Sequence, residues 1–258
     1  MNAAFLSEIA MKTIAQQSQR MIIAHRGYRA RYPENTLVAF KAAKDLGVRM
    51  IELDVCLTRD RNIVAIHDET LDRTTNGSGP VRDHTLEELK KLDAGRWFSP
   101  FFTGEKIPTL KDVFSLCNHK LSVNIEIKHE AFESHDPDDS IEKQVVQTVL
   151  ERSRSEAVII SSFEPRIIER LAKMQIKNLR LAFLTEKRFL DDAILEFMIK
   201  NKVFSWNPDY PALTPDQIKA AQAQGIKVMT YTVNKASTGK RCFDMGVDGI
   251  FTDEPLLF

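Results

Sequence analysis

The chain has 258 residues, of which 43% are hydrophobic, and its 36 basic and 36 acidic residues give a formal net charge of zero. This length and apolar content suit one large domain. The balanced charge argues against a broad surface for nucleic acid or anionic membranes. The three cysteines (Cys56, Cys117 and Cys242) are scattered, which argues against a disulfide framework or a zinc site.

Residues 1–20 form an extension with weak helical periodicity. We interpret it as a helix that covers one end of the fold, or as the result of a misassigned start site. Its apolar run is too short for a secretory signal, and Glu8 interrupts it. No stretch reaches the length of a membrane span. We therefore expect a cytoplasmic protein, monomeric or homodimeric, with no nucleic-acid partner.

From residue 21 to residue 258, apolar β-type runs alternate with amphipathic helical stretches. This alternation indicates βαβ units and a parallel sheet. A (β/α)8 TIM barrel is our first choice of α/β fold; an open doubly wound sheet is second, because no G-x-G-x-x-G turn follows the first strand. The predicted strands are 21–25, 50–57, 63–67, 122–128, 157–162, 180–185, 203–206, 227–233 and 248–252. The predicted helices are 34–46, 84–92, 109–118, 139–152, 165–174, 188–200, 214–224 and 235–245.

Residues 69–107 break this rhythm, since turn residues dominate and four aromatic residues (Trp97, Phe98, Phe101 and Phe102) are clustered. The segment is too long for an ordinary barrel connection. We interpret it as an inserted subdomain over the carboxyl ends of the strands, where barrel active sites form. The alternative is a surface excursion whose aromatic residues pack only in its own small core.

Three carboxylates interrupt otherwise apolar strands. Glu52 and Asp54 share one face of their predicted strand because strand side chains alternate in direction, and Glu126 lies in another strand. Buried charges of this kind are costly for stability alone. Oxygen ligands suit Mg²⁺ or Ca²⁺, with Mn²⁺ as a further candidate. The alternative is that Glu52 and Asp54 are strand-edge charges paired with nearby Arg or Lys.

Two histidines and two cations complete the pattern. His25 and His67 each end an apolar run, and imidazole titrates near neutrality, so the pair suits general acid and base work. Asp68 is expected to point away from His67, as an i+1 neighbour on a strand. Arg26 and Lys128 supply positive charge for a phosphate; alternatively, Lys128 is an exposed charge in a turn.

At these residues the chain resembles the glycerophosphodiester phosphodiesterase family from about residue 21 to its end. The matching segments are His25-Arg26-Gly27, Pro33-Glu34-Asn35-Thr36, Glu52-Leu53-Asp54-Val55, Thr58-Arg59-Asp60, His67-Asp68, Arg73-Thr74-Thr75, Leu92-Asp93-Ala94-Gly95, Ile107-Pro108-Thr109-Leu110, Asn124-Ile125-Glu126-Ile127-Lys128 and Thr252-Asp253-Glu254-Pro255. Each segment alone means little, but their order and spacing together are specific.

The resemblance implies a TIM barrel with a small insertion, and hydrolysis of glycerophosphodiesters to sn-glycerol 3-phosphate and an alcohol. It implies metal ligands at Glu52, Asp54 and Glu126, acid–base histidines at His25 and His67, and phosphate contacts at Arg26 and Lys128. Tyr231 stands where many members carry a tryptophan before Thr-Val-Asn, which keeps an aromatic wall for the substrate.

We assign protonation of the leaving group to His67 and base duty to His25. The attacking oxygen is water or the substrate's own glycerol hydroxyl. One alternative is a related barrel phospholipase that acts on lysophospholipid or sphingolipid head groups, which would need an apolar groove near the aromatic insertion. A second alternative is an inactive barrel used as a binding module.

Overall fold

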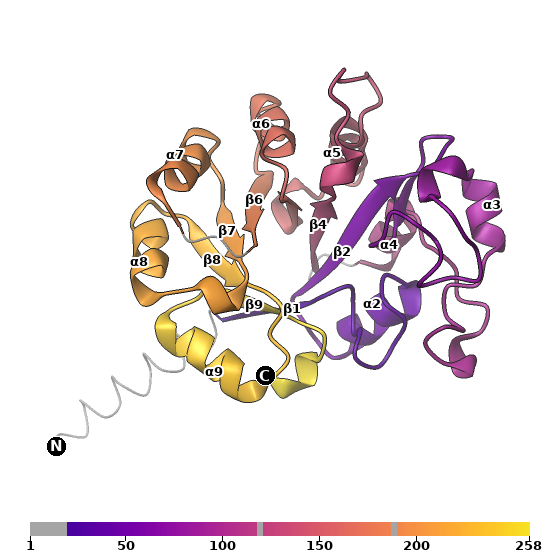
Figure 1. Ribbon diagram of the computed structural model, residues 1–258, viewed down its shortest axis with the longest axis horizontal. Coiled ribbons are helices and arrows are strands. Elements are labelled where there is room, and N and C mark those ends of the chain that lie inside the picture. The colour runs from indigo at the N-terminus through magenta and orange to yellow at the C-terminus, as the bar shows by residue number, and fades with distance from the viewer. Residues whose placement is uncertain (1–19, 118–120, 187–189) are drawn as a thin grey trace.

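The computed structural model describes residues 20–117, 121–186 and 190–258. Within these ranges, eight parallel strands close into a barrel, since β1 pairs with β2 on one side and with β9 on the other (Figure 1). The predicted TIM barrel is confirmed, and closure excludes the open sheet. The barrel strands are β1 (Met21–Ala24), β2 (Met50–Leu57), β4 (Ser122–Ile127), β5 (Val158–Ser162), β6 (Arg180–Thr185), β7 (Ser205–Pro208), β8 (Lys227–Thr230) and β9 (Gly249–Thr252).

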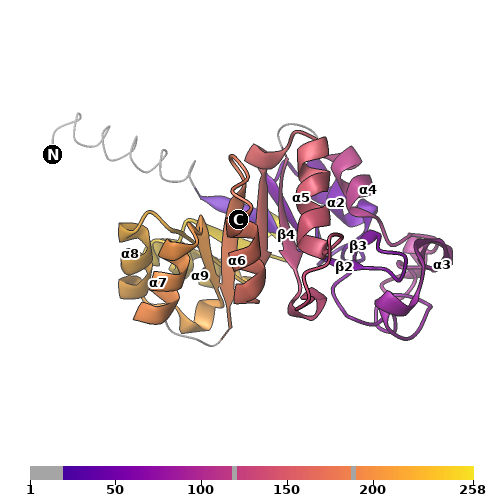
Figure 2. The same ribbon diagram turned by 90° about the horizontal axis from the view of Figure 1, so that it is seen from above.

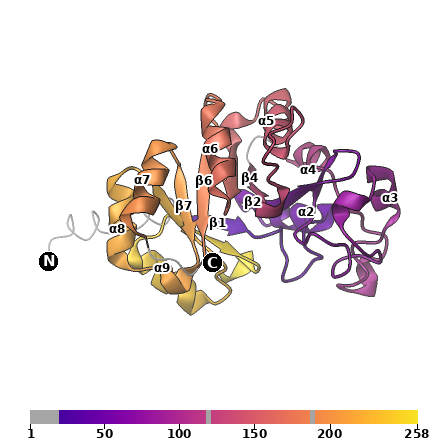
Figure 3. The same ribbon diagram turned by 45° about the horizontal axis from the view of Figure 1, so that its top comes forward.

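Helices surround the barrel, as Figures 1 and 3 show. They are α2 (Leu37–Asp45), α4 (Leu110–Leu116), α5 (Ile141–Glu151), α6 (Pro165–Lys173), α7 (Asp192–Lys200), α8 (Pro215–Ala223) and α9 (Ala236–Met245). Their ends follow local chemistry. At α8, the Thr214 side chain accepts from Gln217 N while Gln217 reaches back to the Thr214 backbone, and Pro215 occupies the first turn. Gly246 ends α9 with φ of 105°.

The bounds of β7 and β8 differ from the prediction. β7 lies at Ser205–Pro208 rather than 203–206. Proline can close this strand because its carbonyl still accepts hydrogen bonds, from Tyr231 N at 3.3 Å and from Thr230 Oγ1 at 2.8 Å. β8 ends at Thr230 rather than 233, and only a single bridge between Asp209 and Tyr231 continues its pairing with the chain after β7.

The core has two layers, because side chains alternate across each strand. One layer fills the inside of the barrel with Ile23, Met50, Ile159, Ala182, Met229 and Phe251. The larger layer lies between the strands and the helices and includes Trp206, which is fully buried and donates from Nε1 to Thr185 Oγ1 at 2.9 Å. Toward the carboxyl ends of the strands, polar side chains such as those of Glu52 and Glu126 follow these apolar residues on the inner face.

The segment after β2 departs from the barrel. β3 (Ile63–Ala65) runs antiparallel to β2 and leads into three short helices, η1 (Val81–Asp83), α3 (Leu86–Lys91) and η2 (Pro100–Phe102). A small separate core holds this segment together, formed by Val64, Ile66, Leu71, Val81, Leu89, Ala94 and Ile107. In Figures 1 to 3, α3 lies on the β2 side of the barrel, away from α7 and α8 (Figure 2).

The aromatic residues of this segment are not part of that small core. Phe98 packs on Phe102, and Phe102 packs on Tyr32 of the β1–α2 connection with ring centroids 5.5 Å apart. Phe101 is 96% exposed and Trp97 is 38% exposed. The aromatic residues therefore join the segment to the barrel loops on one side and face solvent on the other.

The predicted N-terminal extension, residues 1–20, lies outside the described residues except for Arg20. In the part of the chain that the structure describes, no helix combines the length and the apolar character needed to cross a bilayer. The three cysteines are free thiols, with Cys242 buried and the other two half-buried.

Candidate active site

The predicted site residues meet at the carboxyl ends of the barrel strands. There they surround a cavity of about 190 Å³, which we call the central cavity. Its lining includes His25, Arg26, Glu52, His67, Glu126, Lys128 and Tyr231. Asp54 is not among the lining residues, but its side chain contacts two that are, Arg26 and Lys128. Residues far apart in the sequence thus line one pocket at the carboxyl ends of the strands.

The three acids form a compact cluster. Ligand oxygens of Glu52, Asp54 and Glu126 all lie within 4.8 Å of one another. Parallel pairing sets this closeness, because Asp54 and Glu126 are register partners on β2 and β4. The residues are only 2%, 1% and 8% exposed, respectively. Three carboxylates that are this close together and this deeply buried favour a bound cation.

Two further observations fit a metal ion at this cluster. Glu52 Oε1 is buried and has no hydrogen-bond partner among the described residues. Burial raises the pKa of Glu52 well above its usual value, and the neighbouring charges of Asp54 and Glu126 add to the rise. Burial and Asp54 also raise the pKa of Glu126 to about 7. A hard divalent cation would satisfy the free oxygen and bring both carboxyls back to the ionised form.

A tight turn after β1 supports Glu52. The Arg26 N–H donates to Glu52 Oε2 at 2.8 Å, and this requires Arg26 to adopt φ of 55° and Gly27 to adopt φ of 83°. A Cβ at Gly27 would lie 2.7 Å from the backbone carbon of Ala39. The glycine of the His-Arg-Gly segment is therefore required by close packing as well as by its backbone angles.

Asp54 is held in its ionised form. Its Oδ2 is 3.2 Å from Arg26 Nε and accepts from Asn35 Nδ2 at 2.9 Å. Burial alone would raise its pKa, but the neighbouring positive charges, that of Arg26 foremost, outweigh burial and lower it. Asp54 is thus the acid of the cluster that stays charged without a metal ion.

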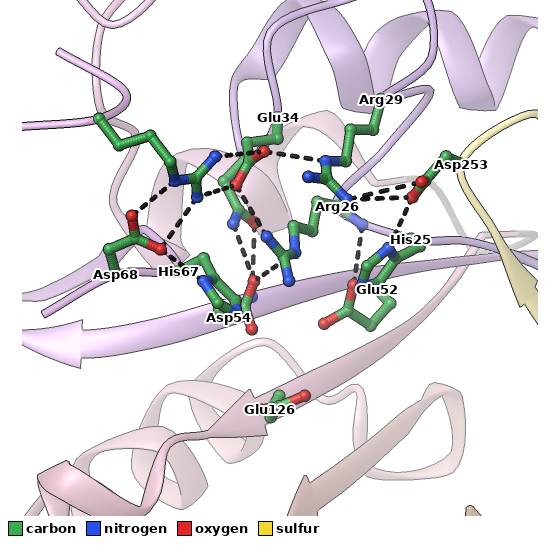
Figure 4. Close-up of polar contacts among 12 residues, drawn as sticks. His25, Arg26, Arg29, Glu34, Glu52, Asp54, His67, Asp68, Glu126 and Asp253 are labelled. Atoms are coloured by element: carbon green, nitrogen blue, oxygen red, sulfur yellow. Dashed lines mark hydrogen bonds and ion pairs between the residues drawn. The ribbon is translucent and has the colours of Figure 1, made fainter. Parts of the chain in front are cut away.

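Each histidine is oriented by a carboxylate. His25 Nδ1 lies 2.7 Å from Asp253 Oδ1, and His67 Nδ1 lies 2.6 Å from Asp68 Oδ1 (Figure 4). The prediction that Asp68 points away from His67 is wrong. β3 ends at Ala65, so the alternation of strand side chains does not extend to residues 67 and 68. With Nδ1–H donated to the acid, each Nε2 is an acceptor.

The imidazoles flank the acid cluster at two ends. In Figure 4, His25 lies beside Glu52 and His67 lies beside Asp54. Burial lowers the pKa of His25, although the hydrogen bond with Asp253 opposes this effect. Burial also lowers the pKa of His67, against the charge of Asp54. Both rings are therefore neutral at neutral pH in the free protein.

Glu34 connects several of these groups. It is 4% exposed, and it accepts from Arg26 Nη1 at 2.8 Å, from Arg29 Nε at 2.8 Å and from Arg73 Nη2 at 2.7 Å. Arg73 in turn donates to Asp68, the partner of His67. Burial opposes ionisation of Glu34, but the arginines outweigh it and hold its pKa far below the usual range.

Lys128 and Tyr231 complete the cavity wall. The Lys128 side chain is 18% exposed, with Nζ 3.1 Å from Glu126 Oε1 and 3.2 Å from His67 Nε2, so it is not the solvated turn charge of the alternative interpretation. The Tyr231 hydroxyl donates to the Thr185 carbonyl at 3.0 Å. Tyr231 therefore presents its ring, and not a free hydroxyl, to the cavity.

Sequence reasoning missed the residues that act behind the site, Glu34, Asp253 and Arg73. Asp253 follows the end of β9 just as His25 follows β1, and this shared position was a usable signal. Glu34 lies in the turn before α2, which begins at Leu37, although the predicted helix 34–46 began at Glu34 itself. Its role depends on three arginines that only folding brings to one point.

Comparison with known proteins identifies relatives of this chain. The family model described as the glycerophosphoryl diester phosphodiesterase family matches residues 25–257. A glycerophosphodiester phosphodiesterase of Caldanaerobacter subterraneus subsp. tengcongensis is 41% identical over 236 residues, covering 91% of this chain and 94% of the relative. One from Bacillus subtilis is 34% identical, covering 92% and 85%.

A solved structure has a similar fold. An Oleispira antarctica phosphodiesterase in complex with the product sn-glycerol-3-phosphate superposes with a TM-score of 0.83 at 28% identity, covering 91% of this chain and 93% of the other. The likeness extends over nearly the whole of both chains.

Proposed function

Because the chain belongs to the glycerophosphoryl diester phosphodiesterase family, we propose that it hydrolyses glycerophosphodiesters to sn-glycerol 3-phosphate and an alcohol. The observation that carries the proposal is the union of three groups in one cavity: the acid cluster, two carboxylate-oriented imidazoles, and the cations Arg26 and Lys128. These are the groups that phosphodiester cleavage requires.

We propose that Glu52, Asp54 and Glu126 hold one divalent cation, Mg²⁺ or Ca²⁺, with Mn²⁺ as a further candidate. The buried free oxygen of Glu52 and the all-oxygen donor set support a hard cation over zinc. When bound, such an ion supplies Lewis acidity at a phosphate oxygen and promotes ionisation of the attacking oxygen. Arg26 and Lys128 would contact the remaining phosphate oxygens and neutralise their charge.

Proton transfer is assigned to the two histidines. The Nε2 of His25 accepts the proton of the attacking oxygen as that oxygen forms its bond to phosphorus. The bond from phosphorus to the leaving oxygen breaks, and His67, protonated once the anionic substrate is bound, gives its Nε2 proton to the alkoxide. The separation of the two rings at opposite ends of the acid cluster supports different partners for them (Figure 4).

Alanine substitution tests this assignment. We expect His25→Ala and His67→Ala each to lower kcat for glycerophosphocholine by about 10²-fold or more. His135→Ala is the matched control, since His135 is exposed and lines neither the central cavity nor its neighbour. Turnover near the unsubstituted level in both active-site variants would refute the acid–base roles.

The nature of the attacking oxygen is a separate question. Attack by the substrate's own glycerol hydroxyl gives a cyclic glycerol phosphate, whereas attack by water does not. Phosphorus NMR of a reaction quenched early distinguishes these routes, because accumulation of the cyclic ester excludes direct attack by water alone.

The size of the central cavity supports a small substrate. At about 190 Å³ it is below the range of pockets for drug-sized ligands. Its lining contains none of the four aromatic residues of the insertion, so the groove that an acylated substrate would need does not lie there. Paired assays on glycerophosphocholine and lysophosphatidylcholine test this preference.

We also propose a cytoplasmic location, as a monomer or homodimer and without a nucleic-acid partner. The zero net charge and the free cysteines support it. Cell fractionation and light scattering of the purified chain test location and assembly.

A further inference from the structure

A second cavity adjoins the central one on the side of the insertion. We call it the side cavity; it encloses about 280 Å³. His67 and Lys128 line both cavities, so these two side chains form their common wall. The remaining walls come from the end of β2, from the insertion and from the segment after β4, as shown by Thr58, Val81 and Ala131. The mechanism above makes no use of this space.

We propose that the side cavity is the subsite for the leaving alcohol, and that it favours alcohols with a positively charged group such as an ammonium. This inference rests on the phosphodiester hydrolysis proposed above and adds where each half of the substrate lies. The glycerol half would remain in the central cavity beside the apolar side chains of Phe163, Leu184 and Phe251.

The position of His67 favours a leaving alcohol in the side cavity. A group that protonates the leaving oxygen must lie within hydrogen-bond reach of that oxygen. His67 stands on the common wall with its Nε2 3.2 Å from Lys128 Nζ, whereas His25 lines only the central cavity of the two. An alcohol released next to His67 therefore has the side cavity directly before it.

The volumes of the two cavities favour a substrate that occupies both. The central cavity must hold the phosphate and one half of the diester, and its volume of about 190 Å³ is small for a complete substrate with a large alcohol. The side cavity supplies the missing room without any movement of the barrel.

The charges around the side cavity favour a cationic alcohol. The side cavity has four cationic side chains in its lining, but three are neutralised by nearby acids. Arg59 lies 3.3 Å from Glu88. Arg61 makes paired contacts of 2.8 Å with Glu133. The third, Lys128, belongs to the acid cluster through its contact with Glu126.

The acids of the lining are less fully paired. Glu69 and Glu130 come from opposite walls, one from the insertion and one from the segment after β4. Neither has an Arg or Lys partner within the described residues, and Glu130 contacts only the ring of His129 at 3.2 Å. The fourth cationic side chain of the lining, Arg82, also has no acidic partner among the described residues. Two carboxylates against one guanidinium leave a negative subsite that favours a cation.

The experiment compares two diesters that differ in the charge of the alcohol, glycerophosphocholine and glycerophosphoglycerol. The measured quantity is the ratio of their kcat/KM values. We expect Glu69→Gln and Glu130→Gln each to lower this ratio about threefold, and the double variant to lower it about tenfold. Arg82→Gln should raise the ratio about threefold. Glu87→Gln, an exposed acid of α3 outside both cavities, is the control and should not change it.

A second variant tests occupancy by size instead of charge. Ala131→Phe narrows the side cavity, so kcat/KM for glycerophosphocholine should fall at least about tenfold more than kcat/KM for the methyl ester of glycerol phosphate. Thermal melting verifies that each variant is folded.

The two proposals fail in different ways. If the unsubstituted protein cleaves both diesters but neither the charge variants nor Ala131→Phe changes relative rates, the subsite is overturned and the function stands. If it cleaves neither diester with Mg²⁺, Ca²⁺ or Mn²⁺, both proposals are overturned.

Discussion

Glu34 offers a sharp test of how the active site is held together. Its side chain is 2% exposed, and its carboxylate accepts hydrogen bonds from three guanidinium groups. Glu34→Gln keeps the shape but removes the charge. Removing one partner of a buried ion pair costs about 3–5 kcal/mol. Arg29 and Arg73 are 31% and 40% exposed, so solvent screens their share. We therefore expect a loss of about 3 kcal/mol in the free energy of unfolding.

The substitution should also lower turnover. Arg26 and Arg73 each lose their ion pair with Glu34. Arg73 also donates to Asp68, which in turn orients His67. A displaced catalytic group costs up to about 10²-fold in rate, so we expect kcat/KM to fall by at least about tenfold. Urea denaturation with linear extrapolation gives the stability change. Glu87→Gln, at 82% side-chain exposure, serves as the control with an expected change below about 0.5 kcal/mol.

The pH dependence has a defined sign. The pKa of Glu34 is lower in the folded than in the unfolded chain, because the arginines outweigh burial. Its stabilisation is therefore fully present above the unfolded pKa of about 4.3 and is lost as pH falls toward the folded pKa. The difference in the free energy of unfolding between the unsubstituted protein and Glu34→Gln should be constant from about pH 7 to 5 and should decrease in stronger acid. A difference below about 1 kcal/mol at pH 7, with normal turnover, would refute the reasoning.

Three further predictions concern other parts of the site. The pKa of Glu126 is raised to about 7, and the carboxyl must lose its proton to bind a cation, so the apparent Kd for Mg²⁺, measured by calorimetry, should rise as pH falls below 7. Glu126→Gln should weaken the binding of Mg²⁺, and excess cation should restore part of the turnover. Asp253→Asn should lower kcat more than it raises KM, because His25 loses its orienting carboxylate; equal effects on both would contradict this. Gly27→Ala should destabilise the fold by about 2 kcal/mol or more in urea titrations, since its φ is positive and its Cβ would meet Ala39.

Some features could be read from the sequence because they depend on local pattern. Strands that are apolar on both faces and alternate with helices predicted the barrel, and the Thr214-Pro215 start of α8 needed only its neighbours in the chain. The acids and histidines of the site were predicted from their places in and at the ends of apolar strands, and from the resemblance to the family.

Other features depended on where the regular pattern stops. Asp68 faces His67 because β3 ends two residues before His67, and strand ends are the least certain part of such a prediction. β7 includes Pro208 because its carbonyl finds donors on the next strand. Neither outcome could be derived from the residues alone.

The sequence by itself thus determined the fold class and the set of chemical groups, because periodicity and strand-end position are properties of the local chain. Only the tertiary structure decided which groups touch. The partners of Glu34 stand at positions 26, 29 and 73, and the acid that orients His25 stands at position 253. The contact between His25 and Asp253 arises from barrel closure, which brings the last strand beside the first, and spacing along the chain carries no record of that distance.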